Sequence, residues 1–185
     1  MRSRLRLWGG LAVLLLSVAC GAGAQSADGP TVKDCANPQL PPELLDGAVA
    51  AVRSPLPVVT ASAPAVTLRL AVANDEASRE LGLMCVTRLR PQHGMIFVFA
   101  ENHDWEFWMK NTLVPLDMLW VDDNGEITTV AARVPASTRD TPDDAVARRR
   151  GRGRYVIELA SGEASTDNLK VGTRLKLPPL HAQSP

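Results

Sequence analysis

The feature that most constrains the fold of this chain is a succession of short apolar segments, separated by turn residues, between Val66 and Leu177. The first of them, Val66–Ala73, alternates apolar and polar residues, which is the pattern of a strand with one buried face. Asp122–Gly125 indicates a hairpin, because Asn-Gly accepts the positive φ angles of tight turns. No strand–helix–strand rhythm repeats, which argues against a doubly wound fold.

We therefore expect one mainly-β domain over residues 66–177, built as a small barrel-like domain or a two-sheet sandwich with one or two short helices. Met95–Phe99 is an unbroken apolar run, as expected of a strand that is covered on both faces. A helix is expected to begin at Asn74–Glu76, where a capping side chain is followed by acids, and to run to about Leu83.

Two polar segments are expected to be loops. Ala100–Asp104 is the shorter one. Residues 135–153 form the longer one, in which Asp140, Asp143 and Asp144 are followed by Arg148, Arg149, Arg150 and Arg152. Such a charge run is typical of a solvated loop, or of a contact with an anionic component of the cell envelope.

The first 24 residues predict an export signal. Arg2, Arg4 and Arg6 precede a short apolar run, Leu11–Ala19, and Ala22–Ala24 supplies the small residues of a cleavage site. The apolar run is about half the roughly 20 residues that a membrane-spanning helix needs. We therefore expect cleavage after Ala24 and a periplasmic protein whose mature chain has no transmembrane helix.

A second interpretation of the same segment is lipid anchoring through Cys20. Leu16–Cys20 resembles a bacterial lipobox, although Ser17 stands where leucine is usual. In either case residues 25–65 are an irregular, Pro- and Ala-rich N-terminal segment, and residues 178–185 are a tail.

The charge balance argues against nucleic acid as a partner. The full chain of 185 residues carries 20 basic and 20 acidic side chains, and removal of residues 1–24 takes away three arginines and leaves a formal charge of −3. His93, His103 and His181 share no ligand spacing, and no nucleotide-binding fingerprint occurs, so we expect no metal and no cofactor. We expect the mature protein to be a monomer.

Two cysteines, Cys35 and Cys85, remain after cleavage. An oxidising compartment would allow a disulfide between them. Two buried free thiols are the alternative, because the sequence does not give the distance between the two residues.

The candidate site is the most aromatic part of the chain. Five of the seven aromatic residues of the mature chain fall between Phe97 and Trp108. On a strand, Glu106, Trp108 and Lys110 would share one face, which could stack a ring and hold its polar groups. The residues expected to bind a small ligand or an envelope protein are Trp105, Trp108, Lys110, Asn111, Thr112 and Asp117.

Two other functions are compatible with these residues. In an envelope hydrolase or lyase acting on a carbohydrate or cell-wall polymer, Glu106 or Asp117 would supply acid–base chemistry beside Lys110. No second carboxylate at a recognisable spacing supports this alternative, so we expect a module without catalytic residues. A purely structural domain is the third alternative, and it predicts that residues 105–117 are fully buried.

Five motifs in order resemble the domain of unknown function 192 family: Leu81–Met84, Gly94–Phe99, Phe107–Thr112, Pro115–Asp117 and Tyr155–Leu159. The resemblance implies a compact, mainly-β, barrel-like domain that is often exported and has no established biochemical activity. It provides no catalytic residues. Cys85 and Val86 stand where the family commonly has an aromatic residue and an arginine, which favours a link from Cys85 to Cys35 that is particular to this chain.

Overall fold

The structure is a computed structural model that describes residue 35, residues 37–45 and residues 55–183. The expected export signal, including Cys20, lies outside these residues.

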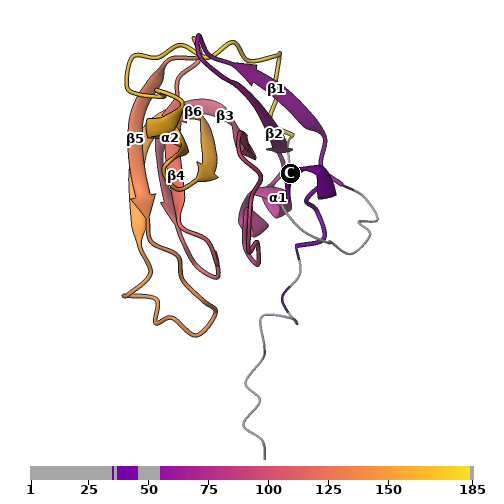
Figure 1. Cartoon of the computed structure of the whole chain (residues 1–185), viewed down its shortest axis with the longest axis vertical. Helices are drawn as coiled ribbons and strands as arrows, with labels where there is room; N and C mark the ends of the chain where they lie inside the picture. The colour runs from indigo at the N-terminus through magenta and orange to yellow at the C-terminus, as the bar shows by residue number, and fades with distance from the viewer. Residues whose placement is uncertain (1–34, 36, 46–54, 184–185) are drawn as a thin grey trace, which may run out of the picture. The chain divides into compact units, whose positions relative to one another are not determined.

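Six strands form a single mixed sheet in the order β1-β2-β3-β6-β4-β5 (Figure 1). All neighbouring strands are antiparallel except β2 and β3, which are parallel. The strands are β1 (Val58–Ser62), β2 (Thr67–Ala73), β3 (His93–Trp108), β4 (Leu116–Val121), β5 (Ile127–Val134) and β6 (Arg148–Ala160). The prediction of a mainly-β domain with short helices is confirmed, and the sheet is not closed into a barrel.

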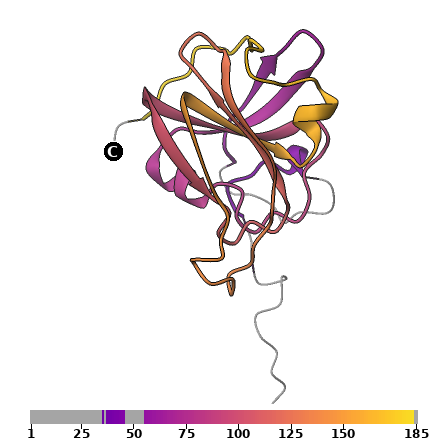
Figure 2. The same ribbon diagram turned by 90° about the vertical axis from the view of Figure 1, so that its left-hand side faces the viewer.

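The sheet needs no second sheet because other segments of the chain cover both of its faces. On one face the sheet residues Phe97, Trp120 and Val156 form a core cluster with Leu40 and Leu44 of the N-terminal segment. This segment contains the 3-10 helix η2 (Pro42–Leu44). The other face packs on residues that include Ala164 of the short helix α2 (Glu163–Thr166) and the C-terminal segment. In Figure 2 the strands pass between α1 and α2.

The helix α1 (Glu76–Leu81) begins where the sequence predicts it. Asp75 is its N-cap, and its carboxylate accepts a hydrogen bond from the backbone N–H of Ser78 at 2.8 Å. The Ser78 hydroxyl accepts one from the Asp75 N–H at 3.3 Å, which completes a capping box. The helix ends at Leu81, two residues earlier than predicted, and a turn continues up to Cys85.

Of the two loop predictions, the one for Ala100–Asp104 is wrong and the one for residues 135–153 is wrong in part. Ala100–Asp104 lies within β3, whose register with β6 shifts between Val98 and His103. Arg148–Gly153, expected in a loop, is the first half of β6 and pairs with His103–Trp108 of β3.

The reason is that this half of β6 has no apolar periodicity to detect. Its inward positions are held by Gly151 and Gly153, which leave room for the Trp120 ring and the Val121 backbone. A Cβ atom at Gly151 would overlap the Trp120 ring, and one at Gly153 would lie 2.8 Å from the Val121 backbone. The partner strand supplies the apolar side chains, among them Trp105.

Candidate functional site

A small pocket of about 40 Å³ lies between the turn after α1 and strands β3 and β6. Three of the predicted ligand-binding residues, Trp108, Lys110 and Thr112, line it. Its other lining residues include Arg79, Glu80, Met84, Phe97, Phe107 and Glu158. The pocket therefore combines aromatic rings with charged side chains of both signs.

Glu158 is a residue of this pocket that the sequence patterns above do not indicate. It is 4% exposed, and burial raises the pKa of its carboxyl group to about 8. Met95 and Met118 flank it on the two neighbouring strands. No hydrogen bond from the described residues reaches its carboxyl group. The signal that could have revealed it is a single glutamate inside the apolar strand segment Tyr155–Leu159.

Lys110 is held at the pocket by a loop and not by Asp117 or Glu106. Its ammonium Nζ donates to Oδ1 of Asp143 at 2.7 Å and to the backbone carbonyl of Thr141 at 2.8 Å. The hydrogen bond from Lys110 lowers the pKa of the Asp143 carboxyl group. The loop between β5 and β6 therefore fixes the position of the ammonium group.

Trp108 and Glu106 lie on the outer face of β3, opposite the arginines of β6. The guanidinium of Arg148 lies over the Trp108 ring, 5.1 Å from its centroid, and Trp108 is 41% exposed. Glu106 pairs with Arg150 at 2.6 Å and with Arg148 at 3.3 Å. The hydrogen bond from Arg150 is the main reason why the pKa of Glu106 is lowered.

Trp105 faces the opposite side of β3, where it is partly buried and packs against the core. Its ring stacks on Phe99 with centroids 3.8 Å apart, and its indole N–H donates to the Gly153 carbonyl at 2.9 Å. Trp105 therefore holds the two long strands together and does not line the pocket.

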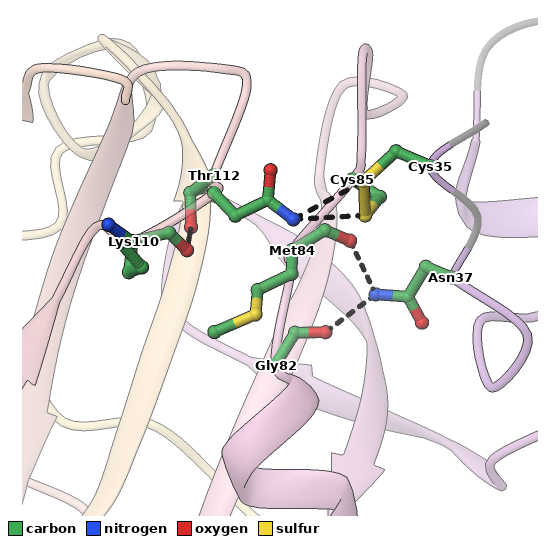
Figure 3. Close-up of a disulfide and its surroundings, with 8 residues drawn as sticks. Cys35, Asn37, Gly82, Met84, Cys85, Lys110 and Thr112 are labelled. Atoms are coloured by element: carbon green, nitrogen blue, oxygen red, sulfur yellow. Dashed lines mark hydrogen bonds between the residues drawn. A yellow bond between two sulfur atoms is a disulfide. The ribbon is translucent and has the colours of Figure 1, made fainter. Parts of the chain in front are cut away.

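Cys35 and Cys85 are joined by a disulfide, with Cα atoms 5.3 Å apart (Figure 3). The side-chain amide of Asn111 donates to both sulfur atoms at 3.3 Å. The next residue, Thr112, is buried, and its hydroxyl donates to the Lys110 carbonyl at 3.4 Å. Asn111 therefore contacts the disulfide, while Thr112 reaches the pocket.

Asp117 is fully buried and lies among backbone donors. Its Oδ1 accepts from the N–H of Arg133 at 2.7 Å, and its Oδ2 accepts from the N–H groups of Gly162 and Ala164 at 2.9 Å each. These bonds tie β4 to β5 and to the start of α2. Asp117 is absent from the pocket lining, so the structure brings together Trp108, Lys110 and Thr112 and places Asp117 elsewhere.

Within the described ranges there is no group of three or more His, Cys, Asp or Glu side chains that could hold a metal ion. No helix among these residues has the length and the apolar character needed to cross a membrane.

Residues 58–177 match the model of the DUF192 family, described as "Uncharacterized ACR". The match covers more than half of the chain, and the chain belongs to this family. The family resemblance seen in the five motifs is therefore confirmed.

Two solved structures share the fold. One, from Sinorhizobium meliloti 1021, is described as "a putative transcription regulator". Its sequence is 31% identical, and the alignment covers 64% of this chain and 90% of the Sinorhizobium chain, with a TM-score of 0.54. The other is a protein of unknown function from Novosphingobium aromaticivorans DSM 12444. Its sequence is 23% identical, and the alignment covers 75% of this chain and 98% of the Novosphingobium chain, with a TM-score of 0.56. None of the curated proteins has a significant match to this chain.

Proposed function

We propose that this DUF192 protein is an exported protein of the bacterial cell envelope that binds a small ligand in the pocket beside Trp108 without transforming it chemically. The observation that carries the proposal is the position of Glu158. It places an unpaired acid inside an aromatic pocket whose lining also includes the predicted residues Trp108 and Lys110. The pocket thus places a few polar groups beside aromatic rings, which is how small-molecule sites fix the orientation of a ligand.

A binding module fits these residues better than a hydrolase or lyase. The two candidate acid–base carboxylates are engaged elsewhere: Glu106 pairs with two arginines, and Asp117 accepts three backbone hydrogen bonds. A purely structural domain is also less well supported, because Trp108 is 41% exposed at the surface.

The Sinorhizobium protein is described as "a putative transcription regulator". The arginines of β6 in this chain do not favour binding to nucleic acid. Arg148 and Arg150 pair with Glu106, and Arg152 pairs with Asp104 at 3.6 Å. Cations that are paired with acids in this way offer little net positive charge to a phosphate backbone.

Export is supported by the N-terminal signal pattern and by the disulfide. Disulfides persist mainly in oxidising compartments such as the periplasm, and Cys35 and Cys85 are bonded here. Cleavage after Ala24 would release the protein into the periplasm, whereas modification of Cys20 would anchor it to a membrane.

The binding function is tested by NMR titration of the mature chain, beginning at Gln25, with methylammonium, ethanol, acetate and N-acetylglucosamine. We expect at least one of these probes to shift the indole N–H resonance of Trp108 and the backbone amide resonance of Thr112 in a saturable way. The double variant Trp108→Ala/Lys110→Ala should weaken that binding at least tenfold.

The control is Val171→Ala/Lys176→Ala, which also removes an exposed apolar side chain and a lysine but lies outside the pocket lining. It should bind as the wild-type protein does. The proposal is wrong if no probe shifts these resonances at concentrations of tens of millimolar, or if the Trp108→Ala/Lys110→Ala variant binds every probe with unchanged affinity.

A further inference from the structure

We propose that the ligand of this pocket is a small organic ammonium group, either a small primary amine or the amino end of a longer molecule, with the carboxylate of Glu158 as its counter-ion. This inference rests on the proposed binding function and names the chemical class of the ligand.

The Glu158 side chain lacks a partner of its own. Glu158 is only 4% exposed, and it lines the pocket. Among the described residues, no backbone or side-chain group donates a hydrogen bond to its carboxyl group, which keeps contact with the pocket. A buried polar group without a partner costs about 1–3 kcal/mol, and an unpaired charge costs more. A ligand that carries N–H donors and a positive charge would supply the partner that the ionised Glu158 carboxylate lacks.

The two cations in the pocket lining are directed away from Glu158. Arg79 donates to the Val98 carbonyl at 3.2 Å and lies over the Phe99 ring. Lys110 binds Asp143. The raised pKa of Glu158 agrees with this, because burial alone accounts for it and no neighbouring cation lowers it. The positive partner that Glu158 lacks would therefore come from a ligand.

The walls of the pocket are suited to a small cation. Phe97 and Phe107 line the pocket and contact each other edge to face, with centroids 4.9 Å apart, and Trp108 and Met84 complete the lining around them. Aromatic rings attract cations by about 0.5–2 kcal/mol, more when water is excluded. A volume of about 40 Å³ is enough for a group as small as methylammonium.

Binding of an ammonium ion must be linked to release of one proton. Glu158 is protonated in the free protein below pH about 8, and it must give its proton to solvent before it can pair with the cation. The neighbouring strands present Met95 and Met118 to it, and the charged groups at the pocket are Arg79, Glu80 and Lys110. The affinity should therefore fall about tenfold per pH unit below pH 8.

The experiment is a titration of the mature chain with methylammonium chloride at pH 6 and pH 9, monitored by the same NMR resonances, with ethanol and acetate as neutral and anionic probes of similar size. We expect methylammonium to bind about 100-fold more tightly at pH 9 than at pH 6. Glu158→Gln should weaken this binding at least tenfold at pH 9 and remove the pH dependence. The control Glu101→Gln, which replaces an exposed glutamate outside the pocket lining, should retain both the binding and its pH dependence.

The outcomes separate the two proposals. If ethanol or acetate binds at Trp108 and methylammonium does not, the ligand class is wrong and the binding function stands. The ligand class is also wrong if methylammonium binds equally at both pH values, or if Glu158→Gln binds it as tightly as the wild-type protein. If no probe binds at all, both proposals fail.

Discussion

Cys35 and Cys85 are bonded to each other although 50 residues separate them in sequence. The bond ties the N-terminal segment to the turn after α1, and this turn forms one wall of the pocket. Asn37 strengthens the same attachment, because its side-chain amide donates to the carbonyls of Gly82 and Met84 at 2.9 and 2.8 Å (Figure 3). The disulfide therefore stabilises the wall of the candidate site as well as the fold.

Removal of this disulfide should destabilise the protein substantially. For a closed loop of this length, the loss of chain entropy in the unfolded state corresponds to about 4 kcal/mol. Cys35→Ser should lower the free energy of unfolding by roughly that amount, measured by urea denaturation. Cys85→Ser and reduction of the wild-type protein with dithiothreitol should give the same value. A reductant that changes neither stability nor gel mobility would exclude the bond.

The stability of the protein should fall as the pH rises from about 4.5 to 8. In this window folded Glu158, with its pKa of about 8, keeps a proton that the unfolded chain, with a pKa of 4.5, has released. The free energy of unfolding therefore decreases with pH, by about 5 kcal/mol at most from this group. Glu158→Gln should match the wild-type protein near pH 4.5 and be more stable by several kcal/mol at pH 9, measured by urea denaturation.

Glu163 must be separated from this effect, because its partial burial also raises its pKa, to about 7. Glu163 therefore also makes the free energy of unfolding decrease as the pH rises, but only between about pH 4.5 and 7. Both the wild-type protein and the Glu158→Gln variant contain Glu163. The difference between their curves of unfolding free energy against pH therefore reports on Glu158 alone. Parallel curves from pH 4.5 to pH 9 would contradict the raised pKa of Glu158.

Asp117→Asn should destabilise the fold and leave the pocket intact. The amide nitrogen of asparagine cannot accept the two N–H groups that Oδ2 of Asp117 binds, so two buried hydrogen bonds are lost. We expect a loss of about 2–4 kcal/mol by urea denaturation. At a urea concentration low enough for the variant to be folded, its affinity for the probe that binds at Trp108 should stay within threefold of the wild-type affinity. A tenfold loss of affinity would contradict this and indicate that Asp117 takes part in ligand binding.

Gly151→Ala should destabilise the protein by disturbing the packing of β6 on the Trp120 ring. Because the new methyl group would overlap the buried indole ring, we expect a loss of about 1–3 kcal/mol by thermal denaturation. Arg152→Ala, the next position on the same strand, removes an exposed and weakly paired side chain and should cost less than about 1 kcal/mol. Equal effects of the two substitutions would contradict the close packing at Gly151.

Processing of the N-terminus can be read from the mass of the protein purified from a bacterial host. We expect the mass of a chain that begins at Gln25. A mass that includes a diacylglycerol on Cys20 would show the lipid-anchored form instead, and Cys20→Ser would then abolish the modification. A chain that still begins at Met1 would contradict export.

Local patterns predicted several elements of the fold correctly because their signals come from residues near in sequence. The capping box at Asp75 depends on a residue three positions away. The hairpin between β4 and β5 depends on Asp122, whose carboxylate accepts the N–H groups of Asn124 and Glu126 at 2.8 Å each. The alternation of Val66–Ala73 likewise indicated β2 without any tertiary information.

The sequence by itself determined the strand-rich architecture, the start of α1 and the presence of an aromatic segment with Trp108 and Lys110. The tertiary structure decided the rest. It paired the arginine half of β6 with β3, where glycines make room for a ring from β4, and it formed the disulfide between Cys35 and Cys85. It also buried the Glu158 side chain between Met95 and Met118 at the pocket. A carboxyl group has an ordinary pKa until residues distant in sequence remove its water. The glutamate within the apolar segment Tyr155–Leu159 could therefore mark a candidate buried acid, but only the tertiary structure showed that it lies unpaired at the pocket.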